Sequence, residues 1–197
     1  MSNNTNFDFD FINKLFQTFP HPEGSTFADG WKVLTKDDKN EVHKRALEKF
    51  KPERVLEFGT HKAEYGYLLK TFHPEVKELV TVCQLPESKQ CTDLVNEYFQ
   101  ENFIQFIEGR IPEVWETVSL EGKFNLGWLD AGHCYDLALG DLRKMKELDI
   151  PVILMDDSDM ESVQLAMKTF LEESPEYQLQ EDTAGIYWVE KSGSHLC

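Results

Sequence analysis

Polar residues and glycines with catalytic or ligand-binding potential stand at the carboxyl end of each of five apolar stretches in the sequence. Each stretch has the length and composition of a buried β-strand, and most are separated by helix-length segments. The carboxyl ends of parallel strands meet at one edge of a sheet, so these residues are expected to lie close together. In chain order they are Glu57 and Gly59, Gln84, Glu108 and Gly109, Asp130, and Asp156 with Asp157.

Three of these residues, Asp130, Asp156 and Asp157, could bind a metal ion. If the fourth and fifth strands are neighbours, they lie about 4.8 Å apart, and carboxylates at their ends can reach one cation. Oxygen ligands suit Mg²⁺, Mn²⁺ or Ca²⁺ better than zinc. Without a cation the carboxylates would repel one another, which would raise at least one pKa. The alternative for Asp157 is a helix cap, because it stands just before a helical segment.

Two histidines lie near these acids in the sequence. His133 follows Asp130 by three residues, and an imidazole that titrates near neutrality could act there as a general base or as a neighbour of a metal ion. A lone histidine often has no such role, so both interpretations stay open. His61 lies just after Gly59 and could equally be an exposed residue of a turn.

The alternation of short apolar runs with helical segments predicts an α/β fold, with a doubly wound, mostly parallel sheet covered on both faces. The predicted strands cover 54–59, 78–85, 103–109, 124–131 and 151–157, and the clearest helices cover 35–50, 86–102, 134–149 and 160–174. Two β-prone segments, 177–184 and 185–191, predict a closing antiparallel hairpin that brings the sheet to seven strands.

Three regions are expected along the chain. Residues 1–34 contain a phenylalanine-rich segment with a short helix and then a turn-rich loop, and they form an N-terminal extension or a lid over a substrate. The aromatic side chains of this region could line the substrate or pack into the core. Residues 35–192 form the main domain, and 193–197 form a loose tail.

Composition and charge narrow the classes of partner. The chain has 197 residues, enough for one domain, with a formal net charge of −16 and a pI near 4.7. Phosphate binding needs clustered Lys and Arg, so neither nucleic acid nor an anionic membrane is expected as a partner. No signal peptide or membrane span is recognisable, and the cysteines lack metal-site spacing, so a cytoplasmic protein is expected. A homodimer stays open.

Three segments resemble motifs of the class I S-adenosylmethionine-dependent methyltransferases, in particular the small branch of catechol and caffeoyl-CoA O-methyltransferases and their bacterial relatives. "VLEFGTHKAEYG" (55–66) resembles the motif after the first strand, while "FNLGWLDAGHCYD" (124–136) and "PVILMDD" (151–157) resemble those of the fourth and fifth strands. The resemblance covers about residues 30–190. It implies a Rossmann-like methyltransferase fold with S-adenosylmethionine as cofactor.

The resemblance also implies roles for individual residues. The implied cofactor-binding residues are Glu57, Gly59, Thr60, His61, Gln84, Glu108, Gly109 and Asp130. The implied metal ligands are Asp130, Asp156 and Asp157, and the implied catalytic residues are His133 and Asp130. In the metal-dependent members the ion lowers the pKa of an acceptor hydroxyl and orients it toward the methyl group.

The sequence departs from the family pattern at three positions. Ala63 stands where a second glycine is usual. Gln84 takes the place of the acid that normally binds the ribose hydroxyls, and an amide would do so more weakly. Arg110 stands where an acid often contacts adenine, which leaves that contact to Glu108.

The resulting hypothesis is O-methylation of a small hydroxylated acceptor, dependent on S-adenosylmethionine and assisted by Mg²⁺ or another divalent cation. Two alternatives stay open: a metal-independent methyltransferase, and a binding or regulatory module that keeps the fold but has lost the activity. A nicotinamide-dependent oxidoreductase is disfavoured, because the first turn lacks GxGxxG and no acid follows the second strand.

Overall fold

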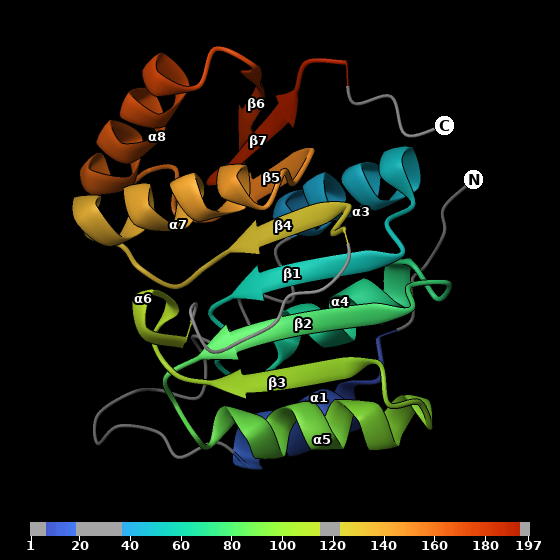
Figure 1. The fold of residues 1–197 in the computed structure, drawn as a ribbon. Helices are drawn as coiled ribbons and strands as arrows, with labels where there is room; N and C mark the ends of the chain where they lie inside the picture. Colours follow the sequence, from blue (N-terminus) through green and yellow to red (C-terminus); the bar gives the residue numbers. More distant parts are fainter. Residues whose placement is uncertain (1–6, 19–36, 115–122, 194–197) are drawn as a thin grey trace.

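The fold is built on a seven-stranded sheet with the strand order β3-β2-β1-β4-β5-β7-β6 (Figure 1). The computed structural model describes residues 7–18, 37–114 and 123–193. The strands are β1 (Arg54–Phe58), β2 (Glu78–Cys83), β3 (Ile104–Glu108), β4 (Leu126–Leu129), β5 (Val152–Met155), β6 (Tyr177–Thr183) and β7 (Ile186–Lys191). Strands β1 to β5 run parallel, whereas β7 is antiparallel to its neighbours β5 and β6. The predicted doubly wound sheet with its closing hairpin is therefore confirmed.

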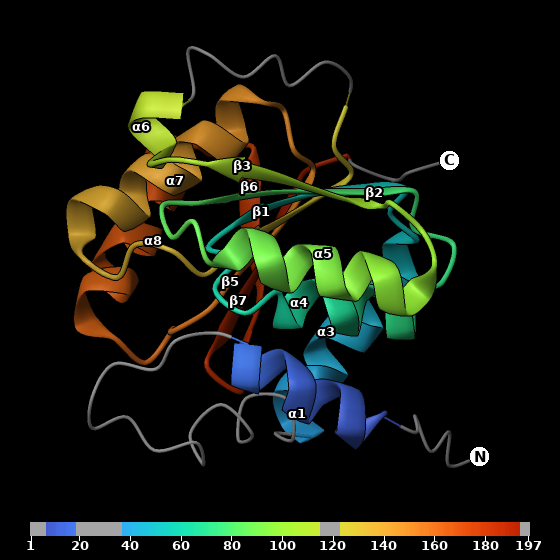
Figure 2. The same cartoon turned by 90° about the horizontal axis from the view of Figure 1, so that it is seen from below.

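Helices cover both faces of the sheet (Figure 2). On one face lie α3 (Asp37–Phe50), α4 (Glu64–Phe72) and α5 (Ser88–Phe99), with α1 (Phe9–Thr18) packed outside them. The other face carries α7 (Tyr135–Glu147) and α8 (Glu161–Glu173), with the short α6 (Ile111–Val114) near the end of β3. The four long helices predicted from the sequence are confirmed, and α6 was not predicted.

The strands alternate their side chains between two apolar cores, one under each helical layer. In β1, Val55 belongs to the core beneath α3 and α4, while Leu56 and Phe58 belong to the core beneath α7 and α8. This is the period of two expected for a strand that is covered on both sides. By the same period Glu57 lies on the α3 and α4 face, where it is only 1% exposed.

Helix α1 contributes to the core beneath α3 and α4. Phe11, Ile12, Leu15 and Phe16 are its buried residues. The Phe11 ring stacks on Tyr98 of α5 with 4.1 Å between ring centroids. The predicted short helix in the phenylalanine-rich segment is thus confirmed. Residues 1–6 and 19–34 of the predicted extension or lid, and most of the predicted tail, lie outside the described residues.

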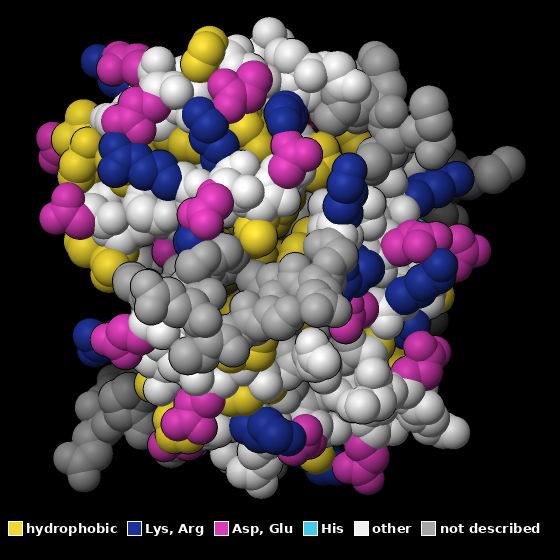
Figure 3. All heavy atoms as spheres, in the orientation of Figure 1, with side chains coloured by type: hydrophobic (Ala, Val, Ile, Leu, Met, Phe, Trp, Pro, Cys, Tyr) yellow, Lys and Arg dark blue, Asp and Glu magenta, His cyan; other side chains and the backbone are white. Residues whose placement is uncertain are grey.

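The described surface is mixed in charge. On the face shown in Figure 3, Lys and Arg side chains are interspersed with Asp and Glu. None of the helices within the described ranges is both long and apolar enough to cross a membrane.

The strand order reverses between β1 and β4, and the ends of these two strands are in direct contact. The Asp130 N–H donates to the Phe58 carbonyl at 2.8 Å, and the Gly59 N–H donates to the Val82 carbonyl at 3.0 Å. Gly59 has a φ of +105°, and a Cβ added there would lie 2.1 Å from the Asp130 carbonyl oxygen. Only glycine satisfies both the backbone angle and this close approach.

We expect Gly59→Ala to destabilise the fold by about 2 to 4 kcal/mol, because the methyl group meets rigid backbone in a conformation that alanine disfavours. The matched control is Gly140→Ala, at a helical position in α7 where an added Cβ meets nothing within 4 Å. That change should raise the free energy of unfolding by about 1 kcal/mol, because alanine has a higher helix propensity than glycine. Equilibrium denaturation in urea measures both, and equal effects at the two glycines would contradict the tight contact at Gly59.

Candidate functional site

The turn between β1 and α4 contains few glycines, but its backbone has the positive φ angles that are typical of a glycine-rich turn. The φ angles of Gly59, His61 and Ala63 are +105°, +43° and +59°. All three lie in the left-handed region, which glycine adopts most easily, so His61 and Ala63 carry a local conformational cost. No side chain caps α4 at Ala63. The first N–H groups of α4 are therefore suited to bind water or a ligand.

The other predicted residues of this turn make contacts with the protein itself. Thr60 is buried, and its hydroxyl is hydrogen-bonded to that of Thr81 on β2. The His61 side chain is 54% exposed, and its Nδ1 lies 3.4 Å from Glu64 Oε1 at the start of α4. Thr60 therefore fixes the turn to the sheet, while His61 lies at its exposed outer side.

Glu57 is a buried acid directly behind the turn. Burial raises its pKa to about 8, although a hydrogen bond from Thr81 opposes the shift and the nearby Asp130 adds to it. Its Oε2 has no hydrogen-bond partner among the described residues, and neither does the buried hydroxyl of Tyr65 on α4. An unpartnered carboxyl oxygen in the interior is costly, and a cationic or hydrogen-bonding ligand would satisfy it.

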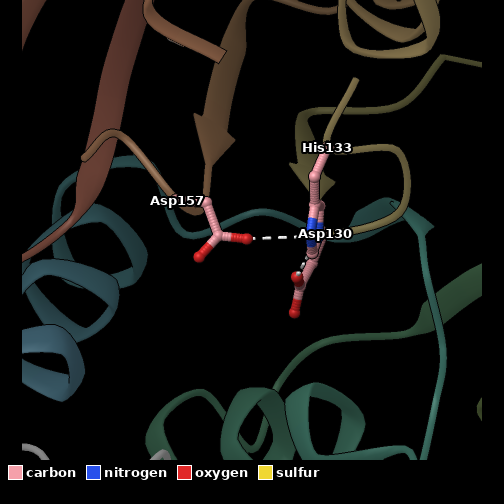
Figure 4. Close-up of side chains that lie close together, drawn as sticks. All are labelled: Asp130, His133 and Asp157. Carbon is pink, nitrogen blue, oxygen red and sulfur yellow. Dashed lines mark ion pairs between the residues drawn. The ribbon is translucent and has the colours of Figure 1, made fainter. Parts of the chain in front are cut away.

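Asp130, His133 and Asp157 meet at the ends of β4 and β5 (Figure 4). His133 Nε2 lies 3.1 Å from Asp157 Oδ2 and 3.8 Å from Asp130 Oδ1. The Asp130 side chain is still 37% exposed. Burial and the nearby Asp156 and Asp157 raise the pKa of Asp130 to about 6, against the effect of His133.

The His133 ring lies beside two carboxylates and is within hydrogen-bond distance of one of them, Asp157. Asp130 and Asp157 raise the pKa of His133 above its ordinary value, because each stabilises the imidazolium form. In the neutral ring the 3.1 Å contact with Asp157 favours the tautomer with its proton on Nε2, which leaves Nδ1 as the basic nitrogen. This geometry suits a general base whose protonated form is stabilised.

Asp156 lies outside this group of ligand atoms. A metal site formed by Asp130, Asp156 and Asp157 stays a prediction. The Asp156 carboxylate forms an ion pair with Lys39 of α3, in which the two side chains are only 13% and 10% exposed. Asp156 Oδ1 also accepts the Asp157 N–H at 2.8 Å. The distances gather Asp130, His133 and Asp157 instead, whose possible ligand atoms lie within 4.8 Å of one another.

The predicted residues at the ends of β2 and β3 are placed together. Gln84 is exposed, and its Oε1 accepts a hydrogen bond from Arg110 Nε at 2.7 Å. Gly109 has a φ of +148° and its N–H donates to the Cys83 carbonyl at 2.9 Å. Glu108 is exposed at the same edge. Gln84 and Arg110, the two departures from the family pattern at this edge, thus pair with each other.

Three further residues near the site were missed by sequence reasoning. Lys39 and His43 lie one turn apart on α3, and the buried His43 ring packs against Trp128 with 4.5 Å between ring centroids. Asp141 of α7 is buried and accepts a hydrogen bond from the backbone N–H of Gly132, in the loop that carries His133. A polar residue that stands at a position of the apolar helix face could have indicated such a buried group. Asp141, spaced between Ala138 and Met145 on the buried face of α7, is an example.

The residues present fit S-adenosylmethionine better than they fit the predicted metal ion. The uncapped start of α4 lies at the switch point, and the unpartnered Glu57 oxygen lies on the strand before it, near Asp130. A cofactor with an ammonium and a sulfonium group suits such a carboxyl. For the predicted metal ion, by contrast, one of the three predicted ligands, Asp156, already forms an ion pair with Lys39.

Solved structures resemble this chain over nearly its whole length. The O-methyltransferase TomG from Streptomyces achromogenes, in complex with SAM, is 16% identical with a TM-score of 0.66 over 95% of this chain and 92% of that one. The SAH-bound methyltransferase PaMTH1 from Podospora anserina is 16% identical with a TM-score of 0.63, over 97% and 99%. An O-methyltransferase from Bacillus cereus in complex with SAH is 11% identical with a TM-score of 0.64, over 92% and 90%.

Sequence comparison adds nothing to this likeness. No protein-family model matches the chain. A search of curated proteins also finds no match. At identities this low the structural likeness establishes the fold, and the chain has the fold of S-adenosylmethionine-dependent O-methyltransferases.

The raised pKa of Glu57 predicts a pH-dependent stability. Because its folded-state pKa is about 8 against an ordinary 4.5, the folded state holds a proton that the unfolded state has lost between these values. The contribution of Glu57 to stability therefore falls as pH rises through this window. We expect Glu57→Gln to gain stability relative to the natural chain by roughly 4 kcal/mol between pH 5 and 9.

Denaturation series in urea at fixed pH values measure this difference. Asp141, whose pKa is raised to about 7 by burial, provides the comparison, since Asp141→Asn should show the same sign over a narrower window. A stability difference for Glu57→Gln that does not change with pH would show that Glu57 is ionised in the folded chain.

Proposed function

We propose that this chain transfers the methyl group of S-adenosylmethionine to a hydroxyl group of a small acceptor molecule. The observation that carries the proposal is the meeting of the Gly59 turn with the buried Glu57 at the switch point of a methyltransferase fold. Ligands of doubly wound sheets bind outside the carboxyl ends of the strands at this point. The solved structures with this fold that contain SAM or SAH add support.

The cofactor would be held by the turn and by the acid behind it. Gly59 lets the turn pack against the Asp130 backbone, and the uncapped N–H groups of α4 can bind polar groups of the ligand. Glu57 would accept a hydrogen bond from an ammonium group through its unpartnered Oε2. Bound S-adenosylmethionine supplies an electrophilic methyl group on a sulfonium, so the protein contributes mainly position and a place for the acceptor proton.

His133 is the proposed general base. The proton of the acceptor hydroxyl would move to His133 Nδ1, while the Nε2–H stays bound to Asp157 and Asp130 lies 3.8 Å away. Both carboxylates stabilise the imidazolium that results, as the raised pKa of His133 indicates. The contacts of Asp156 with Lys39 favour the metal-independent form of this reaction over the metal-assisted one.

We expect the chain to bind S-adenosylmethionine and S-adenosylhomocysteine, and binding near pH 7 to release a proton. Glu57 is mostly neutral at this pH because its pKa is about 8, and a bound cation would lower that pKa. Calorimetric titrations in two buffers of different ionisation enthalpy measure the released proton. Glu57→Gln should bind more weakly and release none.

The neighbouring Glu64→Gln is the control, since it removes a carboxylate from α4 and leaves the buried one. A failure of both ligands to bind the natural chain would contradict the proposed function. Binding without methyl transfer to any of a pool of phenols, sugars and carboxylates would favour the alternative of a binding or regulatory module.

We expect His133→Gln to lower kcat by about 10² to 10⁴ with little change in cofactor affinity, because it removes the proton acceptor. In the natural chain the rate should rise with pH through the raised pKa of His133, as the ring loses its proton. The variant should lack that rise. Cys134→Ser, at the exposed next residue, is the control, and an unchanged pH profile in His133→Gln would remove His133 from the mechanism.

A further inference from the structure

Lys39 brings a positive charge to the acidic edge of the sheet from outside the strands. It lies in the first turn of α3, and its Nζ forms an ion pair with Asp156 at the end of β5, 117 residues away in sequence. The two side chains are only 13% and 10% exposed. Such an ion pair is screened far less by salt than a surface pair.

The position of Lys39 in the first turn of α3 is electrostatically unfavourable, and the ion pair with Asp156 offsets this cost. A cation in the first turn of a helix lies at the positive end of the helix dipole, where acids are preferred. The β6–β7 turn also leaves room for the lysine, since a Cβ added at Gly185 would lie 3.5 Å from Lys39 Cε. The lysine side chain thus passes beside Gly185 to reach Asp156.

We propose that the Lys39 ammonium takes the place of a divalent metal ion at this edge, so that the chain binds no such ion between Asp130, Asp156 and Asp157. Three carboxylates that could attract a cation are met by two internal partners, Lys39 on Asp156 and His133 on Asp157 and Asp130. The sequence therefore contains the acids of a metal site, and the fold neutralises them from within.

The contacts around Asp156 explain why an ion would not displace the lysine. Asp156 Oδ1 receives both the ammonium and the Asp157 N–H. An incoming ion would have to remove a nearly buried ammonium from its partner and leave it unpaired, which costs several kcal/mol. His43, one turn further along α3, does not add a second charge, because burial lowers its pKa to about 4.

This inference deepens the proposed function, on which it rests for its catalytic meaning. An acceptor hydroxyl at this edge would lose its proton to a side chain without activation by a metal ion. Ion binding itself, however, requires neither cofactor nor acceptor. A test with ions alone therefore separates a failure of this inference from a failure of the methyltransferase proposal.

The test is a titration of the full chain with MnCl₂, followed by calorimetry and by the thermal midpoint, against NaCl at matched ionic strength. The natural chain should show no binding and no shift. Lys39→Ala removes the ammonium, leaves Asp156 as an uncompensated charge and opens space for an ion. It should gain Mn²⁺ binding, with a midpoint raised by several degrees, and Lys39→Ala combined with Asp156→Asn should lose that gain.

Lys49→Ala is the matched control, because it removes another ion pair of α3, with Glu190 at 2.6 Å, far from the site. It should gain no Mn²⁺ binding. Binding of Mn²⁺ by the natural chain, or a folded Lys39→Ala chain that gains none, would overturn the inference. If Lys39→Ala does not fold even with Mn²⁺, the titration of the natural chain decides: absence of binding supports the inference and binding overturns it.

Discussion

The contact between the ends of β1 and β4 is the constraint on which the rest of the site depends. Because β1 pairs with β4 in parallel, with Phe58 beside Leu129, the next residues of both strands emerge together. Gly59 and Asp130 then lie so close that a side chain at 59 would overlap the Asp130 carbonyl. The two loops that carry the candidate cofactor residues and the candidate base are thereby held in one fixed arrangement.

The acids at this edge of the sheet differ in how deeply they are buried and therefore in their charge partners. Glu57 lies on the face of β1 that α3 and α4 cover, and burial keeps its carboxyl group largely neutral at neutral pH. Asp130, Asp156 and Asp157 lie further out, where Lys39 forms an ion pair with Asp156 and the His133 ring lies beside Asp157 and Asp130. Among the described residues, Glu57 is the one buried acid with an unpartnered oxygen, and a cationic ligand behind the Gly59 turn would satisfy it. The protein therefore neutralises its outer acids itself and keeps the inner one available.

The sequence predicted what depends on local pattern. The strands follow from apolar runs such as 152–155, and the helices from the spacing of their apolar residues. The rule for strand ends then placed Asp130 beside Gly59 and near His133. The Lys39–Asp156 pair could not be predicted in this way, because it joins residues 117 positions apart and depends on how α3 packs. The neutral state of Glu57 was hidden for a similar reason, since burial depends on the covering helices.

The central claim is that the edge of the sheet beside Gly59 and Asp130 binds S-adenosylmethionine. Hydrogen–deuterium exchange of the full chain, with and without saturating cofactor, tests it most directly. We expect slower exchange in peptides that cover residues 59–66 and 130–134, and no change in peptides of the β6–β7 hairpin. Unchanged exchange throughout, or slower exchange only in regions away from these two loops, would contradict the claim.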